Sequence, residues 1–179
     1  NWKENLPEIS EEINIVNLTS DESNQGLLDP YVLMKRRKDA ESLAIDILTF
    51  LTGISSRDSE RFPLLRKAIR SVTQREIRGL WLVIDELRLD ENPVAHSIAD
   101  HIESFTDYDF AHLLFSDGTT ENSISLDKQL NIVQVADLIL PDTQSNFSEY
   151  TTIELLSVAM LIVLSTFALD FIHSDRSKF

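Results

Sequence analysis

Hydrophobic residues between positions 39 and 115 recur every three or four residues, which is the spacing of helices that bury one face. Asp39 is the predicted N-cap of the first helix, and Gly53 is placed to end it. A second helix is predicted over 59–74, and shorter ones over 80–87, 93–104 and 108–115. The apolar positions that define the first two helices are Leu43, Ala44, Ile47, Leu48, Leu51, Phe62, Leu65, Ala68, Ile69 and Val72.

Two segments outside this helical region have the short, β-branched pattern of strands, namely 13–18 and 130–138. A third and shorter strand is predicted over 123–126. Between the first strand and the helices, Asp29-Pro30 predicts a turn, because a residue before proline is disfavoured in the helical region. The predicted order is therefore a strand, a helical region and then further strands.

The last predicted helix begins at a capping box, in which Thr151 and Glu154 bond each other's main-chain N–H groups. It continues to about residue 173 and is apolar on nearly every face, which predicts burial on all sides. The uncharged run between Glu154 and Asp170 is 15 residues long, whereas a membrane span needs about 20. We therefore expect a core helix and no membrane span.

A helix that is apolar on all sides is typical of an α/β core, in which a parallel sheet is covered by other elements. The sequence holds too few strands to complete such a sheet. We interpret the chain as a helix-dominated, incomplete α/β core formed by residues 1–34 and 119–179. Residues 35–118 are then an inserted, all-helical subdomain.

The net charge of -14 excludes nucleic-acid binding by the surface as a whole, but the charge is unevenly distributed. Residues 35–78 contain 11 Lys or Arg against 6 acids, so this stretch carries +5 and the rest of the chain -19. A helix face bearing Arg66, Lys67 and Arg70 is accordingly our candidate partner-binding surface. The alternative is that these cations only solvate the helix.

No catalytic, cofactor-binding or metal-binding residue is predicted. The four glycines are isolated from one another, so no phosphate-binding loop is present. The chain has no cysteine, which excludes disulfides and thiolate metal sites and fits a cytoplasmic protein. A His and acid cluster lacks the spacing of a zinc site and is interpreted as solvated helix ends; it comprises His96, Asp100, His101, Glu103, Asp107, Asp109 and His112.

Three stretches carry a family resemblance: Ile-Val-Asn-Leu-Thr-Ser-Asp-Glu with Gly-Leu-Leu-Asp-Pro-Tyr, the run from Asp39 to Gly53, and Thr151 to Leu161. Through them the whole chain resembles the large motor ATPase of conjugative type IV secretion systems. The likeness is closest to the forms carried by conjugative transposons and plasmids of Gram-positive bacteria. Asp29 departs from the Asn-Pro turn that related motors have at this position.

The resemblance implies a RecA-like P-loop ATPase core. In that family the phosphate-binding loop precedes the position matching Asn1, and the metal-binding strand follows the position matching Phe179. The chain, which starts without an initiator methionine, is therefore expected to be an excised and inactive fragment that carries no cofactor of its own.

The parent implied by the resemblance uses ATP and magnesium and works as a homo-hexamer at the cytoplasmic face of the membrane. Its implied partners are a coupling protein, secretion-channel components and DNA, and its role is to power DNA transfer or channel assembly. A different class remains open on the residues alone. In that alternative, the chain is a stand-alone helical module for protein–protein interaction.

Overall fold

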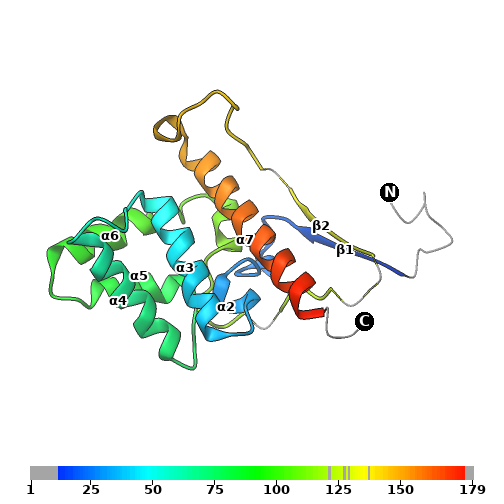
Figure 1. Cartoon of the computed structure of the whole chain (residues 1–179), viewed down its shortest axis with the longest axis horizontal. Coiled ribbons are helices and arrows are strands. Elements are labelled where there is room, and N and C mark those ends of the chain that lie inside the picture. Colours follow the sequence, from blue (N-terminus) through cyan, green and yellow to red (C-terminus); the bar gives the residue numbers. More distant parts are fainter. Residues whose placement is uncertain (1–11, 121, 127, 129, 137, 176–179) are drawn as a thin grey trace.

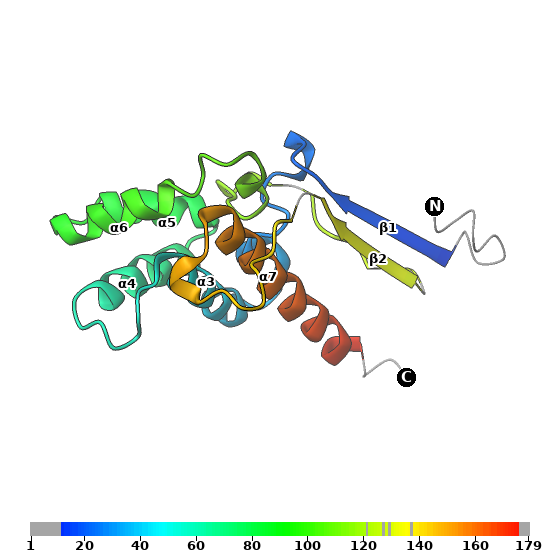
Figure 2. The same ribbon diagram turned by 90° about the horizontal axis from the view of Figure 1, so that it is seen from above.

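The computed structural model describes residues 12–120, 122–126, 128, 130–136 and 138–175. It is a helix-rich α/β structure, as predicted, in which a group of helices lies on one side and a small sheet extends on the other (Figures 1 and 2). The long C-terminal helix α7 (Thr152–Asp175) runs between them. The helical group comprises α3 (Arg37–Thr52), α4 (Arg61–Gln74), α5 (Leu80–Arg88) and α6 (Pro93–Glu103).

The sheet consists of two parallel strands, β1 (Ile13–Leu18) and β2 (Leu130–Val135), in a register that pairs Ile13 with Leu130 and Leu18 with Val135. Both strands were predicted, although β2 ends earlier than position 138, and residue 137 lies outside the described part. The strand expected over 123–126 was wrong. That segment joins no ladder; its main chain is held instead by the Asn14 side chain, which donates to the Ser125 carbonyl oxygen at 2.7 Å.

Helix α3 ends as predicted at Gly53, which adopts the left-handed conformation with φ 65°. Its start was predicted wrongly, because the N-cap is Arg36 and not Asp39. Asp39 lies inside the first turn and reaches back to the Arg36 guanidinium at 2.5 Å. A carboxylate is favourable there as well, since it faces the positive end of the helix dipole. The sequence signal therefore marked the first turn and misplaced the cap.

The other helices of the group occur where they were expected, with small changes at their ends. Residues predicted as a helix over 108–115 form instead the short 3₁₀ turn η3 (Asp109–Leu113). The four-residue helix α2 (Pro30–Leu33) was not predicted. Its signal was present, since Asp29 caps it and Pro30 stands at its first position, where the missing N–H costs nothing. Two further 3₁₀ turns are η2 (Glu22–Asn24) and η4 (Phe147–Glu149).

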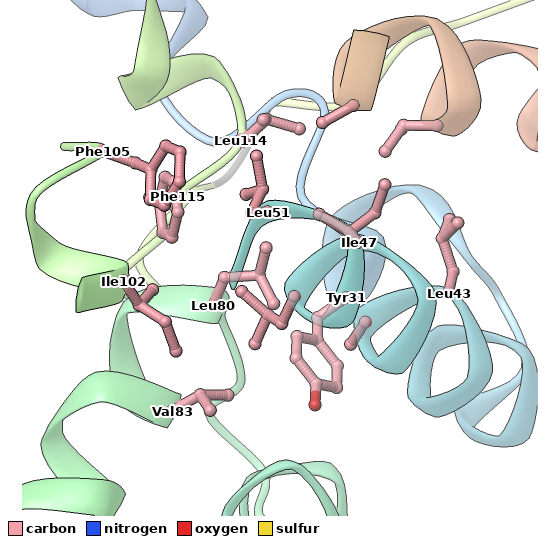
Figure 3. Close-up of a cluster of buried hydrophobic side chains, with 14 of the residues drawn as sticks. Tyr31, Leu43, Ile47, Leu51, Leu80, Val83, Ile102, Phe105, Leu114 and Phe115 are labelled. Atoms are coloured by element: carbon pink, nitrogen blue, oxygen red, sulfur yellow. The ribbon is translucent and has the colours of Figure 1, made fainter. Parts of the chain in front are cut away.

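The helical group has a continuous apolar core, to which each helix contributes residues spaced three or four apart. Figure 3 shows this core around α3 and the start of α5, with aromatic rings from the segment after α6 closing one side. Helix α3 packs against both α4 and α7, and α5 packs against α6. The labelled side chains are Tyr31, Leu43, Ile47, Leu51, Leu80, Val83, Ile102, Phe105, Leu114 and Phe115.

Helix α7 begins at the predicted capping box, in which the Thr151 N–H donates to Glu154 at 2.7 Å and the Glu154 N–H donates to Thr151 at 3.3 Å. One face of its first half is buried, with Leu156, Ala159, Met160 and Val163 inside the core, whereas Leu155, Val158 and Leu161 are only partly buried. The expectation of burial on all sides was wrong, most clearly for the second half. Leu169 and Ile172 are 56% and 51% exposed, because no described element covers that side.

Among the described residues, Thr152–His173 of α7 is the single helical stretch that is long and apolar enough to cross a membrane. Only 28% of its most apolar window is buried. The measurement of length and hydropathy is equally compatible with a core helix, so the expectation of no membrane span stays a prediction.

Gly79 offers a test of how closely the chain segments approach at the start of α5. A Cβ atom added there would lie 2.0 Å from the Ser116 carbonyl oxygen, so Gly79→Ala forces main chain apart. We expect a loss of about 3 kcal/mol in the free energy of unfolding, measured by urea denaturation. Gly53→Ala is the control, because a Cβ atom there meets nothing within 4 Å and only its positive φ costs about 1 kcal/mol. Equal losses would contradict the close approach.

Candidate functional site

The predicted partner-binding cations lie on the outer face of α4, and all three are exposed. Two of them are engaged within the chain. The Lys67 ammonium donates to Asp90 at 2.7 Å, and this hydrogen bond raises the pKa of Lys67 and lowers that of Asp90. The Arg70 guanidinium lies 3.9 Å from Glu41 of α3. These contacts brace α4 against its neighbours, so they favour a structural role for both residues.

Arg66 differs from the other two cations of the face. It is exposed and has no ion pair among the residues that the structure describes. Of the predicted surface, it is therefore the cation that is free to meet a partner. Arg57, on the loop before α4, is likewise exposed and has no ion pair among the described residues, but it lies outside the α4 face.

The cluster of histidines and acids is divided by the fold. His96 of α6 contacts the Asp90 carbonyl oxygen at 2.7 Å, and His101 stacks on Phe105. Arg88 holds Asp100 and Glu103 in ion pairs. Within the described ranges, no group of three or more His, Asp or Glu side chains is arranged to hold a metal ion.

The remaining members of the cluster line a separate, polar cavity of about 370 Å³. Asp107, Asp109 and His112 are joined there by Glu22 of η2, which the sequence did not connect with them. The His112 Nε2 atom is buried without a hydrogen-bond partner in the described structure. The cavity lies beside the segment that leaves the carboxyl end of β1.

The most completely organised polar group is Asp29, which sequence reasoning treated only as part of a turn. Its side chain is fully buried. One carboxylate oxygen, Oδ1, accepts the Tyr31 N–H at 2.8 Å, and thereby caps α2. The other oxygen, Oδ2, accepts the Leu80 N–H at 2.7 Å and the Ser116 N–H at 2.9 Å. We call this arrangement the Asp29 clasp.

The Asp29 clasp joins three segments that are far apart in the sequence. Tyr31 lies in α2, which precedes the helical group, Leu80 is the first residue of α5, and Ser116 follows η3, after the group. Two helix N-termini thus point their unpaired N–H groups at one carboxylate, which is the favourable end of each helix dipole for an anion. Because all three N–H groups are satisfied by Asp29, they are not available to cradle a phosphate.

Burial raises the pKa of the Asp29 carboxyl from 3.8 to about 7, while the N–H donors of Leu80, Ser116 and Tyr31 act in the opposite direction. Burial also raises the pKa of the neighbouring Tyr31 hydroxyl. That hydroxyl bonds the Ile69 carbonyl oxygen at 3.2 Å and Thr73 at 3.1 Å, both on α4. Asp29 and Tyr31 together therefore tie the short helix α2 to α4, α5 and the segment after η3.

Three of the four glycines meet at the Asp29 clasp, although the sequence separates them widely. Cβ atoms added to Gly26, Gly79 or Gly118 would lie 2.6 Å, 2.0 Å and 2.3 Å from their nearest neighbours. Gly26 and Gly118 also have positive φ angles. These glycines allow the three main chains to approach closely enough for one short carboxylate to reach all three N–H groups.

Removal of the Asp29 carboxylate tests how far the fold depends on it. Asp29→Ala leaves three buried N–H groups without acceptors, and each such group costs about 1–3 kcal/mol. We expect a loss of at least about 3 kcal/mol in the free energy of unfolding, measured by urea denaturation. Asn92→Ala is the matched control, since Asn92 caps α6 through one bond to the Val94 N–H and should cost about 1 kcal/mol. A loss for Asp29→Ala no larger than the control would show that the clasp is dispensable.

Comparison of the chain with protein-family models gives one match, to the AAA-like domain, over residues 1–179. Comparisons with curated proteins and with solved structures each gave no match. The two parallel strands, the helices between them in sequence and the apolar helix that follows are consistent with part of a P-loop NTPase-like fold. Since the match spans the whole chain, this protein belongs to the AAA-like domain family.

Proposed function

We propose that this chain is a segment of the motor ATPase of a conjugative type IV secretion system, with a RecA-like core. The segment lies between the phosphate-binding loop and the metal-binding strand, and the assembled motor powers DNA transfer or channel assembly. Membership of a family that is found in ATPases of conjugative secretion systems supports this proposal. The resemblance of the three sequence stretches described above adds the conjugative assignment.

ATP and magnesium belong to the assembled motor in this proposal, and the residues described here do not fit them. The glycines that meet in space do so around a carboxylate, whose negative charge would repel a phosphate. Within the described ranges, no three or more His, Asp or Glu side chains are grouped to hold a metal ion. We therefore assign no step of ATP hydrolysis to this chain, and the chain by itself is expected to be inactive.

The observation that carries the proposal is the uncovered apolar surface around the second half of α7. Two parallel strands alone do not make a stable sheet, and parallel sheets are normally covered on both faces. Here α7 and β2 border an apolar cavity of about 550 Å³, and a second of about 550 Å³ adjoins it. An apolar surface of this kind is expected where a core helix lies beside a sheet whose other strands are missing. The apolar lining of the two cavities includes Leu126, Leu130, Val133, Leu164, Phe167 and Phe171.

The proposed partners follow from the motor assignment. They are identical subunits in a hexamer, a coupling protein, channel components and DNA, at the cytoplasmic face of the membrane. The helical group supplies an exposed basic face on α4, where Arg66 is free of intrachain ion pairs among the described residues. This face is our candidate for the contact with a neighbouring subunit or transfer partner.

A stand-alone interaction module is the second candidate function. The observation in its favour is that the helical group is held by a continuous apolar core, part of which Figure 3 shows, and that the first half of α7 packs into the same core. In that case the exposed half of α7 is an ordinary surface or a docking surface. The two candidates therefore differ in what happens when that half of α7 is made polar.

Leu169→Glu distinguishes the two functions. Leu169 is 56% exposed in this chain. If it stays on the surface in the complete protein, Leu169→Glu should change the free energy of unfolding by less than about 0.5 kcal/mol. If further strands of a motor cover α7, the same substitution buries a charge and costs about 3 kcal/mol or more. We expect the complete gene product with Leu169→Glu to lower the frequency of DNA transfer in a mating assay by roughly 100-fold.

Leu89→Glu is the control for that assay, because Leu89 is 78% exposed on the turn after α5. It introduces the same charge on the helical group, where no covering strand is proposed. We expect normal transfer from it. Normal transfer from both variants would count against the motor and favour the interaction module.

Charge reversal at Arg66 tests the basic face. Arg66→Glu should weaken association of this chain with the assembled motor about fivefold to tenfold at low salt, and less at high salt, because exposed charges are screened. The measurement is a binding titration at two salt concentrations. Arg57→Glu is the control, since Arg57 is exposed but lies outside α4. Identical affinities for the two variants would indicate that Arg66 is an ordinary solvent-exposed residue and makes no contact with the motor.

A further inference from the structure

We propose that copies of this chain associate head to tail, so that a cluster of cations on one copy docks against an acidic cavity on the next. The inference names the surfaces by which identical subunits of the proposed motor would meet, and in that respect it rests on the proposed function. The basic cluster consists of Lys35, Arg37 and Lys38 at the start of α3, and the carboxylates of the acidic cavity are those of Glu22, Asp107 and Asp109.

The basic cluster lies where the helix itself disfavours positive charge. Residues 35–38 are four consecutive Lys or Arg, all exposed, and they lead into the first turn of α3. This end of a helix carries a partial positive charge, so cations there are unfavourable, and no side chain caps α3. Departures from such local rules are expected at functional sites, which makes the basic cluster a candidate binding surface.

Most of this positive charge is unpaired within the chain. Among the described residues, Arg36 is the only one of the four that forms ion pairs, with acids of α3 and α7. The Arg37 guanidinium donates to the Gln74 carbonyl oxygen at 3.2 Å, which leaves its charge without a carboxylate. Lys35 and Lys38 have no ion pair in the described structure. Three exposed cations are therefore available to an anionic partner.

The acidic cavity is the polar cavity of about 370 Å³ beside η2 and η3. Its three carboxylates belong to exposed residues and make no ion pair with a Lys or Arg that the structure describes. The buried Nε2 atom of His112, which lines the same cavity, also has no described hydrogen-bond partner. The acids of the helical group differ, because ion pairs hold Glu41, Glu86, Asp90 and Glu103. The cavity therefore gathers polar groups that the chain itself leaves without partners.

The form of the cavity favours Lys and Arg side chains over a single metal ion. Within the described ranges, no three His, Asp or Glu side chains are grouped to hold a metal ion, so the carboxylates of the cavity do not converge on one point. Several separate cations at the start of a helix match such a spread of charge. The Tyr108 ring also lines the cavity, and a guanidinium or ammonium group is attracted to the face of an aromatic ring.

A second copy is the occupant that accounts for both surfaces. No ion pair joins the basic cluster to the acidic cavity within the described part of the chain. A nucleic acid or an anionic membrane could neutralise the basic cluster, but it would leave the acidic cavity unexplained and would meet a chain with a net charge of -14. Since the two surfaces differ, the contact between copies is heterologous, and its repetition builds a ring or a filament.

The test compares the self-association of four forms of the purified chain by sedimentation over a range of concentrations. Lys35→Glu with Lys38→Glu reverses the basic cluster, and acids at this end of α3 are favourable for the helix. Glu22→Lys with Asp109→Lys reverses the acidic cavity at exposed positions. We expect the unmodified chain to associate, and each reversed variant alone to associate at least about tenfold more weakly.

An equimolar mixture of the two reversed variants should restore association, because the intact acidic cavity of the first meets the intact basic cluster of the second. Arg57→Glu with Lys128→Glu is the matched control. It makes the same change of charge as Lys35→Glu with Lys38→Glu, at exposed positions outside the cluster, and should associate like the unmodified chain. If the variant of the acidic cavity does not fold, the variant of the basic cluster should still bind the unmodified chain through its own cavity and limit the size of its assemblies.

The proposal is overturned if the unmodified chain stays monomeric, if the mixture stays monomeric, or if the control associates as weakly as the reversed variants. Association that persists in each reversed variant alone, as it would through the exposed side of α7, also overturns it. A monomeric chain that binds a DNA duplex only while Lys35 and Lys38 are intact would make nucleic acid the partner instead. Failure of the motor assignment is seen separately, as normal DNA transfer by Leu169→Glu, and does not change the mass measured by sedimentation.

Discussion

A single buried carboxylate sets the arrangement of the helical group in this protein. Asp29 is the acceptor for N–H groups from three segments, two of which are the first turns of helices. Such N–H groups have no partner within their own helix and must find one elsewhere when they are buried. The position of α5 relative to α2, and the return of the chain after η3, both follow from this requirement. Gly26, Gly79 and Gly118 make this arrangement possible, because a Cβ atom at any of these positions would clash with a neighbouring segment.

The arrangement also explains why an Asp is suited to this position. A carboxylate accepts hydrogen bonds on both oxygens, whereas an Asn amide would direct its own N–H groups at one side of the Asp29 clasp. The charge is costly in the interior but is matched by two helix dipoles. The cost of burying this charge and the hydrogen bonds that offset it therefore meet at one group, which fixes the fold.

Periodicity and capping signals predicted most of the fold, because they report local physics. The spacing of apolar residues located α3 to α6, the Thr151 capping box located α7, and Gly53 located the end of α3. The start of α3 was less accessible, since Asp39 satisfies the dipole from within the first turn as well as a cap would. The Asp29 clasp could not be predicted, because Leu80 and Ser116 are 51 and 87 residues away from it. Their donors are main-chain groups, which leave no mark in the sequence.

The parallel pairing of β1 with β2 has a consequence for the order in which the chain folds. Asn14 and Asn131, which bond each other across the two strands, are 117 residues apart in the sequence. Closing so long a loop is entropically costly while the intervening chain is unfolded, and non-local pairing slows folding. The helices between the strands form local contacts first and shorten the effective loop. We therefore expect the sheet to assemble last, and an error in the helical group would leave two strand edges exposed to other chains.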